Sequence, residues 1–222
     1  MGYYTRELLD LFDNDVMNIE LLGTRGTGLN RHEGRNNWSA YSYTHESTYA
    51  GLSNPFWNSN SNSFDFTKYM NDNNYSSVDI VSIGLGTNDR GVIGSTADEF
   101  KTNLQTIINS IKNFNSSIKI LLLLPPPVCS VGYDYTSWNM SIKIANKTII
   151  DTFNNKENEN IYIVSSGLNV DPVNDYTMTT IPVNEGSSVT KTIVSDPIHP
   201  AVIGFKHIAD MIYPTLKYLG SL

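Results

Sequence analysis

The sequence predicts an α/β fold in which buried parallel strands alternate with helices. Two runs rich in aliphatic and β-branched residues, 78–85 and 118–124, flank a segment whose apolar residues recur at helical spacing. A second helical pattern over 137–153 leads into a third short β run at 161–164. Strands that alternate with helices in this way are joined by crossovers and form one parallel sheet.

The amino-terminal part of the chain predicts less regular structure. Leucines and Phe12 at helical spacing predict a helix over 4–12, which begins close to Met1. The run 19–23 predicts a short strand that ends at a Gly. Residues 24–74 show little periodicity and many Asn, Ser, Gly and aromatic residues. A stretch this long is either a functional loop or partly helical.

The remaining elements have clear start and stop signals. Ser95 is the expected N-cap of the helix that runs to Ile111, and the strand at 118–124 is stopped by three prolines. A Thr-rich alternating pattern over 176–194 predicts a β-hairpin inserted before the last helix. That helix is expected over 200–219, with a bend near Pro214.

Composition narrows the classes of partner. The 222 residues suit a single domain, 1–222, and the net charge of -7 disfavours nucleic acid and anionic membranes. Abundant Asn, Ser and Tyr fit a neutral or glycan-like partner, although biased codon usage explains them equally well. No apolar run approaches about 18 residues, so no membrane span is expected.

No cofactor or metal is expected. His32, His45 and His207 lack the spacing of metal ligands, and Gly84-x-Gly86 lacks the third glycine of a dinucleotide fingerprint. The lone Cys129 permits no internal disulfide.

Two short motifs contain the candidate catalytic residues. Asp196 stands three residues before His199, which suits a carboxylate that orients a general-base imidazole. Asn88 follows the strand at 78–85, where the carboxyl ends of parallel strands form the ligand crevice, and suits an oxyanion donor. An isolated Asp-x-x-His is more often a helix N-cap followed by a surface histidine. Its order after the Asn88 motif favours the catalytic interpretation.

With these motifs the chain resembles the SGNH (GDSL-like) hydrolases, which are serine esterases and lipases with a flavodoxin-like three-layer α/β/α sandwich. The third and fifth conserved blocks of that family look like Gly86-Thr87-Asn88-Asp89 and Asp196-Pro197-Ile198-His199-Pro200 with Gly204. Phrases similar to those of bacterial members linked to carbohydrate-ester deacetylation are Leu22-Gly23-Thr24-Arg25-Gly26, His32-Glu33-Gly34-Arg35, Trp38 and Asn54-Pro55-Phe56-Trp57-Asn58.

The chain departs from the family pattern in two places. The first block, a Gly-Asp-Ser that supplies the nucleophile, is absent, so the expectation is a fold that lacks its first strand in a sequence that begins at an internal Met. The block would then be encoded about ten residues upstream. In the second block Asn37 stands where a Gly lines the oxyanion hole, with Gly34 as the alternative alignment. Asn tolerates left-handed backbone angles and can still present its N–H.

The resemblance implies a serine esterase of small acyl esters, with carbohydrate O-acetyl esters as expected substrates. His199 would be the base, Asp196 its orienting carboxylate, and Asn88 with the backbone of Asn37 the oxyanion hole. The alternative is a non-catalytic module that has lost its nucleophile and binds a glycan or another partner. Whether the protein is cytoplasmic or secreted, and its oligomeric state, stay open.

Overall fold

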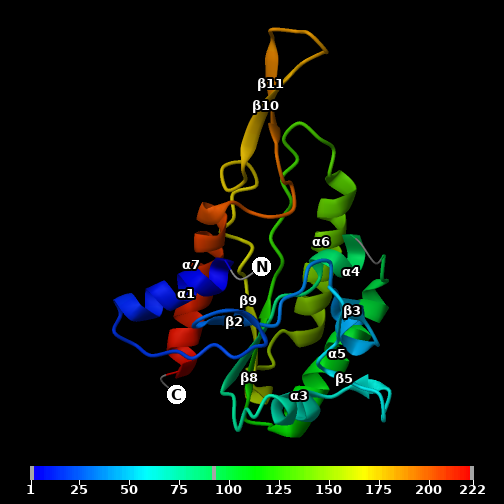
Figure 1. Ribbon diagram of the computed structural model, residues 1–222, viewed down its shortest axis with the longest axis vertical. Helices are drawn as coiled ribbons and strands as arrows, with labels where there is room; N and C mark the ends of the chain where they lie inside the picture. The colour runs from blue at the N-terminus through cyan, green and yellow to red at the C-terminus, as the bar shows by residue number, and fades with distance from the viewer. Residues whose placement is uncertain (1–2, 92–93, 221–222) are drawn as a thin grey trace.

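A parallel sheet forms the centre of the protein (Figure 1). The computed structural model describes residues 3–91 and 94–220, so Met1 and Gly2 lie outside the described residues. Within it, β7 (Ile80–Ile83), β8 (Lys119–Leu123) and β9 (Ile161–Val164) pair in the order β7-β8-β9. The three predicted strands are thereby confirmed.

Helices cover both faces of this sheet, which gives three layers. The side chains of β8 alternate: Ile120 and Leu122 belong to one buried cluster, Leu121 and Leu123 to the other. The first cluster packs against α5 and α6, the second against α1 and α7, on opposite sides of the sheet in Figure 1. These helices are α1 (Tyr3–Asn14), α5 (Ala97–Phe114), α6 (Thr136–Phe153) and α7 (Val202–Gly220).

The N-cap of α5 is Thr96, not Ser95. The Thr96 hydroxyl accepts a hydrogen bond from the Glu99 backbone N–H at 3.2 Å, and the Glu99 carboxylate accepts one from the Thr96 N–H at 2.7 Å. This reciprocal capping box satisfies two free N–H groups, whereas a cap at Ser95 would place Asp98 in the position of Glu99.

The strand predicted over 19–23 does not form. Residues 17–23 take part in no strand ladder of the described structure, and Gly23 instead exchanges hydrogen bonds with the Tyr75 hydroxyl. A strand needs a neighbour, and among the described residues β7 pairs only with β8. Ser82 in β7 is exposed, whereas the neighbouring strand β8 is almost wholly buried. This difference is consistent with an edge position for β7.

The polar segment 24–74 is more regular than its sequence suggested. Short two-stranded ladders and two helices are tied together by aromatic side chains that reach the core around Phe56 and Phe66. The elements are β1 (Arg25–Thr27), β2 (Asn30–His32), α2 (Ala40–Thr44), β3 (Thr48–Tyr49), β4 (Leu52–Ser53), β5 (Trp57–Asn58), β6 (Ser63–Phe64) and α3 (Phe66–Asp72).

The predicted hairpin is confirmed. It consists of β10 (Met178–Pro182) and β11 (Thr190–Val194), and it projects from the end of the molecule where β8 and β9 finish (Figure 1). Two short helices complete the description, α4 (Thr87–Gly91) after β7 and a 3-10 turn (Glu157–Glu159) before β9.

Candidate functional site

Asp196 and His199 form a hydrogen-bonded pair in the loop between the hairpin and α7. His199 Nδ1 lies 2.8 Å from Asp196 Oδ2, while Asp196 Oδ1 accepts the backbone N–H groups of Ile198 and His199 at 3.0 and 3.1 Å. The carboxylate therefore both caps the turn and orients the ring. Within residues 3–91 and 94–220, Nε2 of His199 has no hydrogen-bond partner, so this nitrogen is free to take a proton.

The electrostatics of the pair keep Asp196 ionised. Partial burial opposes ionisation, but hydrogen bonds from the backbone and ring of His199 and from the Ile198 N–H outweigh it and lower the pKa of Asp196 below its ordinary value. A carboxylate that stays charged favours the imidazolium that a general base becomes once it has accepted a proton.

The pair lies above the carboxyl end of the sheet. The Cys129 N–H donates to the Pro197 carbonyl at 2.9 Å, which holds the loop against the segment that follows β8. Asn88 stands just past the end of β7, the neighbouring strand. Both sequence motifs are thus brought to one edge of the sheet, where ligands of open α/β folds bind.

Asn88 and Asn37 are joined through Trp38. The Asn88 side-chain NH₂ donates to the Trp38 carbonyl at 2.9 Å, and this uses one of its two N–H bonds. Asn37, the next residue back, has φ 60°, the left-handed conformation expected where the family has Gly. The half-buried Asn88 on α4 is therefore bonded to the residue that follows the exposed Asn37, while no hydrogen bond of the described residues links Asn37 or Asn88 to Asp196 or His199.

Asp89 braces this arrangement from below the surface. Its side chain is fully buried, and its oxygens accept the backbone N–H groups of Ala40 at 2.8 Å and Gly86 at 3.0 Å. Burial raises the pKa of Asp89 to about 6, although both N–H groups favour the charged form. Asp89 thus fastens the turn after β7 to the start of α2.

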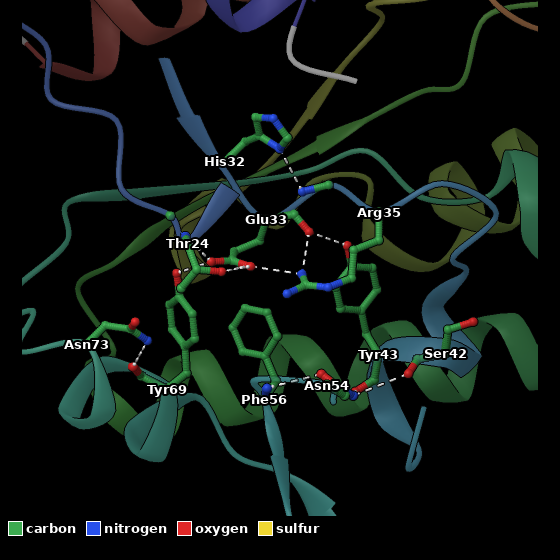
Figure 2. A network of polar contacts seen from close by, with 12 residues as sticks. Thr24, His32, Glu33, Arg35, Ser42, Tyr43, Asn54, Phe56, Tyr69 and Asn73 are labelled. Carbon is green, nitrogen blue, oxygen red and sulfur yellow. Dashed lines mark hydrogen bonds and ion pairs between the residues drawn. The ribbon is translucent and has the colours of Figure 1, made fainter. Parts of the chain in front are cut away.

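Glu33 and Arg35 form an ion pair within a network of polar contacts (Figure 2). Arg35 is 4% exposed and donates from NH1 to Glu33 Oε2 at 2.8 Å and to the Glu33 carbonyl at 2.8 Å. The Glu33 carboxylate also accepts hydrogen bonds from the hydroxyl and backbone N–H of Thr24 and from the Tyr69 hydroxyl. Every lone-pair direction of this carboxylate is used, as a buried charge requires.

The ion pair reaches the candidate oxyanion donors through Trp38. The Arg35 guanidinium lies 5.0 Å from the centre of the Trp38 ring, and the Trp38 N–H donates to the Arg35 carbonyl at 3.3 Å. Trp38 in turn accepts from Asn88. The sequence analysis predicted no role for Glu33 and Arg35. The sequence feature that could have indicated their ion pair is a Glu and an Arg two residues apart in a polar segment.

Comparison with protein families decides the assignment. A family model described as GDSL-like lipase/acylhydrolase matches residues 15–212. The chain belongs to this family. A comparison with curated protein sequences finds no match.

Several solved structures share the fold. A carbohydrate esterase of family 3 from Talaromyces cellulolyticus is 17% identical, with a TM-score of 0.64 over 99% of this chain and 92% of that one. A carbohydrate acetylesterase family member from Sinorhizobium meliloti is 12% identical, with a TM-score of 0.62 over 99% and 87%. An acetyl esterase variant with a bound acetate ion is 17% identical, with a TM-score of 0.62 over 99% and 91%. The expected α/β fold is confirmed.

Two further features of this GDSL-like chain bear on its chemistry. In the described part of the chain, no three His, Cys, Asp or Glu side chains gather where they could hold a metal ion. Among the same residues, no helix is long and apolar enough to cross a membrane.

Proposed function

We propose that this protein hydrolyses small acyl esters, with O-acetyl groups on a carbohydrate as its substrates. A hydrolase of acyl esters follows from the family, and the proteins with similar structures include a carbohydrate esterase and acetylesterases. The observation that carries the proposal is the 2.8 Å contact between His199 Nδ1 and Asp196 Oδ2 with Nε2 left free. In this proposal His199 is the general base and Asp196 orients it.

The oxyanion donors in the proposal are Asn88 and the backbone N–H of Asn37. Asn88 keeps one side-chain N–H after its bond to the Trp38 carbonyl, and Asn37 has the left-handed φ expected where the family has a Gly whose backbone N–H lines the oxyanion hole. Donors fixed before the reaction stabilise the tetrahedral oxyanion without reorganising.

The nucleophile is proposed to be a Ser on a strand that pairs with the open edge of β7 and leads into α1. Two observations support this position. In the part of the chain that the structure describes, β7 has a ladder partner on one side only. Tyr3 in the first turn of α1 stacks on Phe205 near the start of α7, with ring centres 5.1 Å apart. A Ser about ten residues upstream, at the end of such a strand, would lead into α1 by a short connection, and α1 packs against the helix that follows His199.

The test measures hydrolysis of 4-nitrophenyl acetate and acetylated xylo-oligosaccharides by the protein extended with the segment encoded directly upstream in its gene. Asn88→Ala should lower turnover by about 10²–10³-fold, whereas Asn109→Ala on the exposed side of α5 should leave it unchanged. Equal activities of the two variants would remove Asn88 from the oxyanion hole.

The second candidate function is a non-catalytic glycan-binding module. It is favoured by the absence, among the described residues, of a hydroxyl or thiol bonded to His199 Nε2. An upstream segment without Gly-Asp-Ser, together with binding of xylo-oligosaccharides and no hydrolysis, would establish this alternative.

A further inference from the structure

The two ends of the segment 176–200 lie beside each other at Asp175. The Ala201 N–H donates to the Asp175 carbonyl at 2.7 Å. Between these residues the chain forms the β10–β11 hairpin and then the loop with Asp196 and His199. This backbone hydrogen bond therefore joins the two ends of the segment that carries the proposed base.

The Asp175 side chain makes a second connection between the two ends of this segment. It is 3% exposed, and its Oδ2 accepts from His207 Nδ1 at 2.7 Å and from the Asp171 N–H at 2.8 Å. His207 lies on α7, so one buried carboxylate joins the turn ahead of the hairpin to the helix that follows His199. The two backbones touch here, since a Cβ on Gly204 would lie 2.9 Å from the Asp175 carbonyl oxygen.

His199 depends on such support because its own surroundings are open. Its side chain is 61% exposed, and the only side chain bonded to it among the described residues is Asp196, itself half exposed. Both belong to the same short loop, so their hydrogen bond orients the ring within the loop but does not place the loop on the sheet. That placement comes from the ends of the segment, from the Cys129 contact with Pro197, and from the Val194 N–H, which donates to the Val131 carbonyl at 2.9 Å.

We infer that Asp175 is a positioning residue for His199, acting through His207 and through the backbone of Ala201. The buried carboxylate holds α7 and the turn 171–175 together, and the loop between them is thereby held over the carboxyl ends of the strands. The inference rests on the proposed function, because positioning presupposes a reaction at His199. Its main readout, however, requires no ester hydrolysis.

The experiment is NMR and amide hydrogen exchange on the full chain at one fixed pH. Asp175→Asn and His207→Leu should each weaken the low-field Nδ1–H resonance of the His199–Asp196 hydrogen bond. Each should also speed hydrogen exchange of the Ala201 amide by about 10–100-fold, which corresponds to the loss of one charge-assisted hydrogen bond. Exchange in β8 should not change. His207→Asn keeps an N–H donor and should restore both signals; Asp210→Asn, an exposed change on the same helix, should leave both as in the parent.

Several outcomes separate this inference from the proposed function. Faster exchange in β8 and at Ala201 alike would show general destabilisation and overturn it, as would an unchanged His199 resonance in His207→Leu. In the extended protein, Asp175→Asn should lower kcat and leave KM as it is. An inactive extended protein whose His199 resonance still responds to His207→Leu would refute the esterase while leaving the role of Asp175 in place.

Discussion

Replacing Glu33 with Gln should lower the free energy of unfolding by about 3 kcal/mol, because it leaves the Arg35 guanidinium buried without its counter-charge. The two side chains are 15% and 4% exposed. Gln can still accept from the Tyr69 hydroxyl through Oε1, but it loses the 2.8 Å charged hydrogen bond to Arg35 NH1, worth about 1.5–3 kcal/mol. The uncompensated charge adds to this loss.

The assay is urea unfolding of the two single variants and the double variant. Arg35→Met removes the other charge, and the double variant should be less destabilised than the sum of the single variants by about 1–3 kcal/mol. Asp151→Asn is the matched control, since its ion pair with Lys147 is exposed and its loss should change stability by less than about 0.5 kcal/mol. A Glu33→Gln effect as small as the control, with additive single variants, would refute the reasoning.

Three further predictions concern Asp89, Phe100 and Trp38. The pKa of Asp89 rises from 3.8 to about 6 on folding, so the native state binds the proton more tightly than the unfolded state does. Lowering the pH from 7 to 4.5 should therefore stabilise the parent relative to Asp89→Asn by about 2 kcal/mol, and a pH-independent difference in urea unfolding would contradict this. Phe100→Ala should lower stability by about 3–5 kcal/mol, because the ring is completely buried between α5 and the sheet; calorimetry that shows under about 1 kcal/mol would count against that packing. Trp38→Leu should remove the cation–π contact with Arg35 and broaden the Asn88 side-chain NH₂ signals in NMR spectra, and sharp, unshifted signals would disprove the link.

The strands and long helices could be predicted because their signals are local. The run at 118–124 is apolar on both sides, as a strand covered by helices on both faces must be, and its end is fixed by three prolines that cannot donate to a ladder. The hairpin followed from alternation around a turn. Helix boundaries depended on reciprocal contacts, which is why Thr96 rather than Ser95 is the cap of α5.

What the sequence could not predict depends on distant partners. The run 19–23 has the composition of a strand, but a strand forms only where another offers its hydrogen-bonding edge. The Asp175–His207 contact joins residues 32 positions apart, and Asn88 meets the Trp38 carbonyl across 50. No local pattern encodes such pairs. In contrast, the three-residue spacing of Asp196 and His199 already places them within hydrogen-bonding reach, and this contact is present in the structure.

The most direct measurement of the central proposal compares ester hydrolysis by the extended protein and by its His199→Ala and His45→Ala variants. His45 lies on α2's carboxyl end and stacks on Tyr41, away from the Asp196 loop in the fold, so it controls for loss of an imidazole. If His199 is the base, its removal should lower kcat by at least about 10³-fold with the His45 variant unchanged. Activity that survives His199→Ala would contradict the assignment of Asp196 and His199 as the acid–base pair.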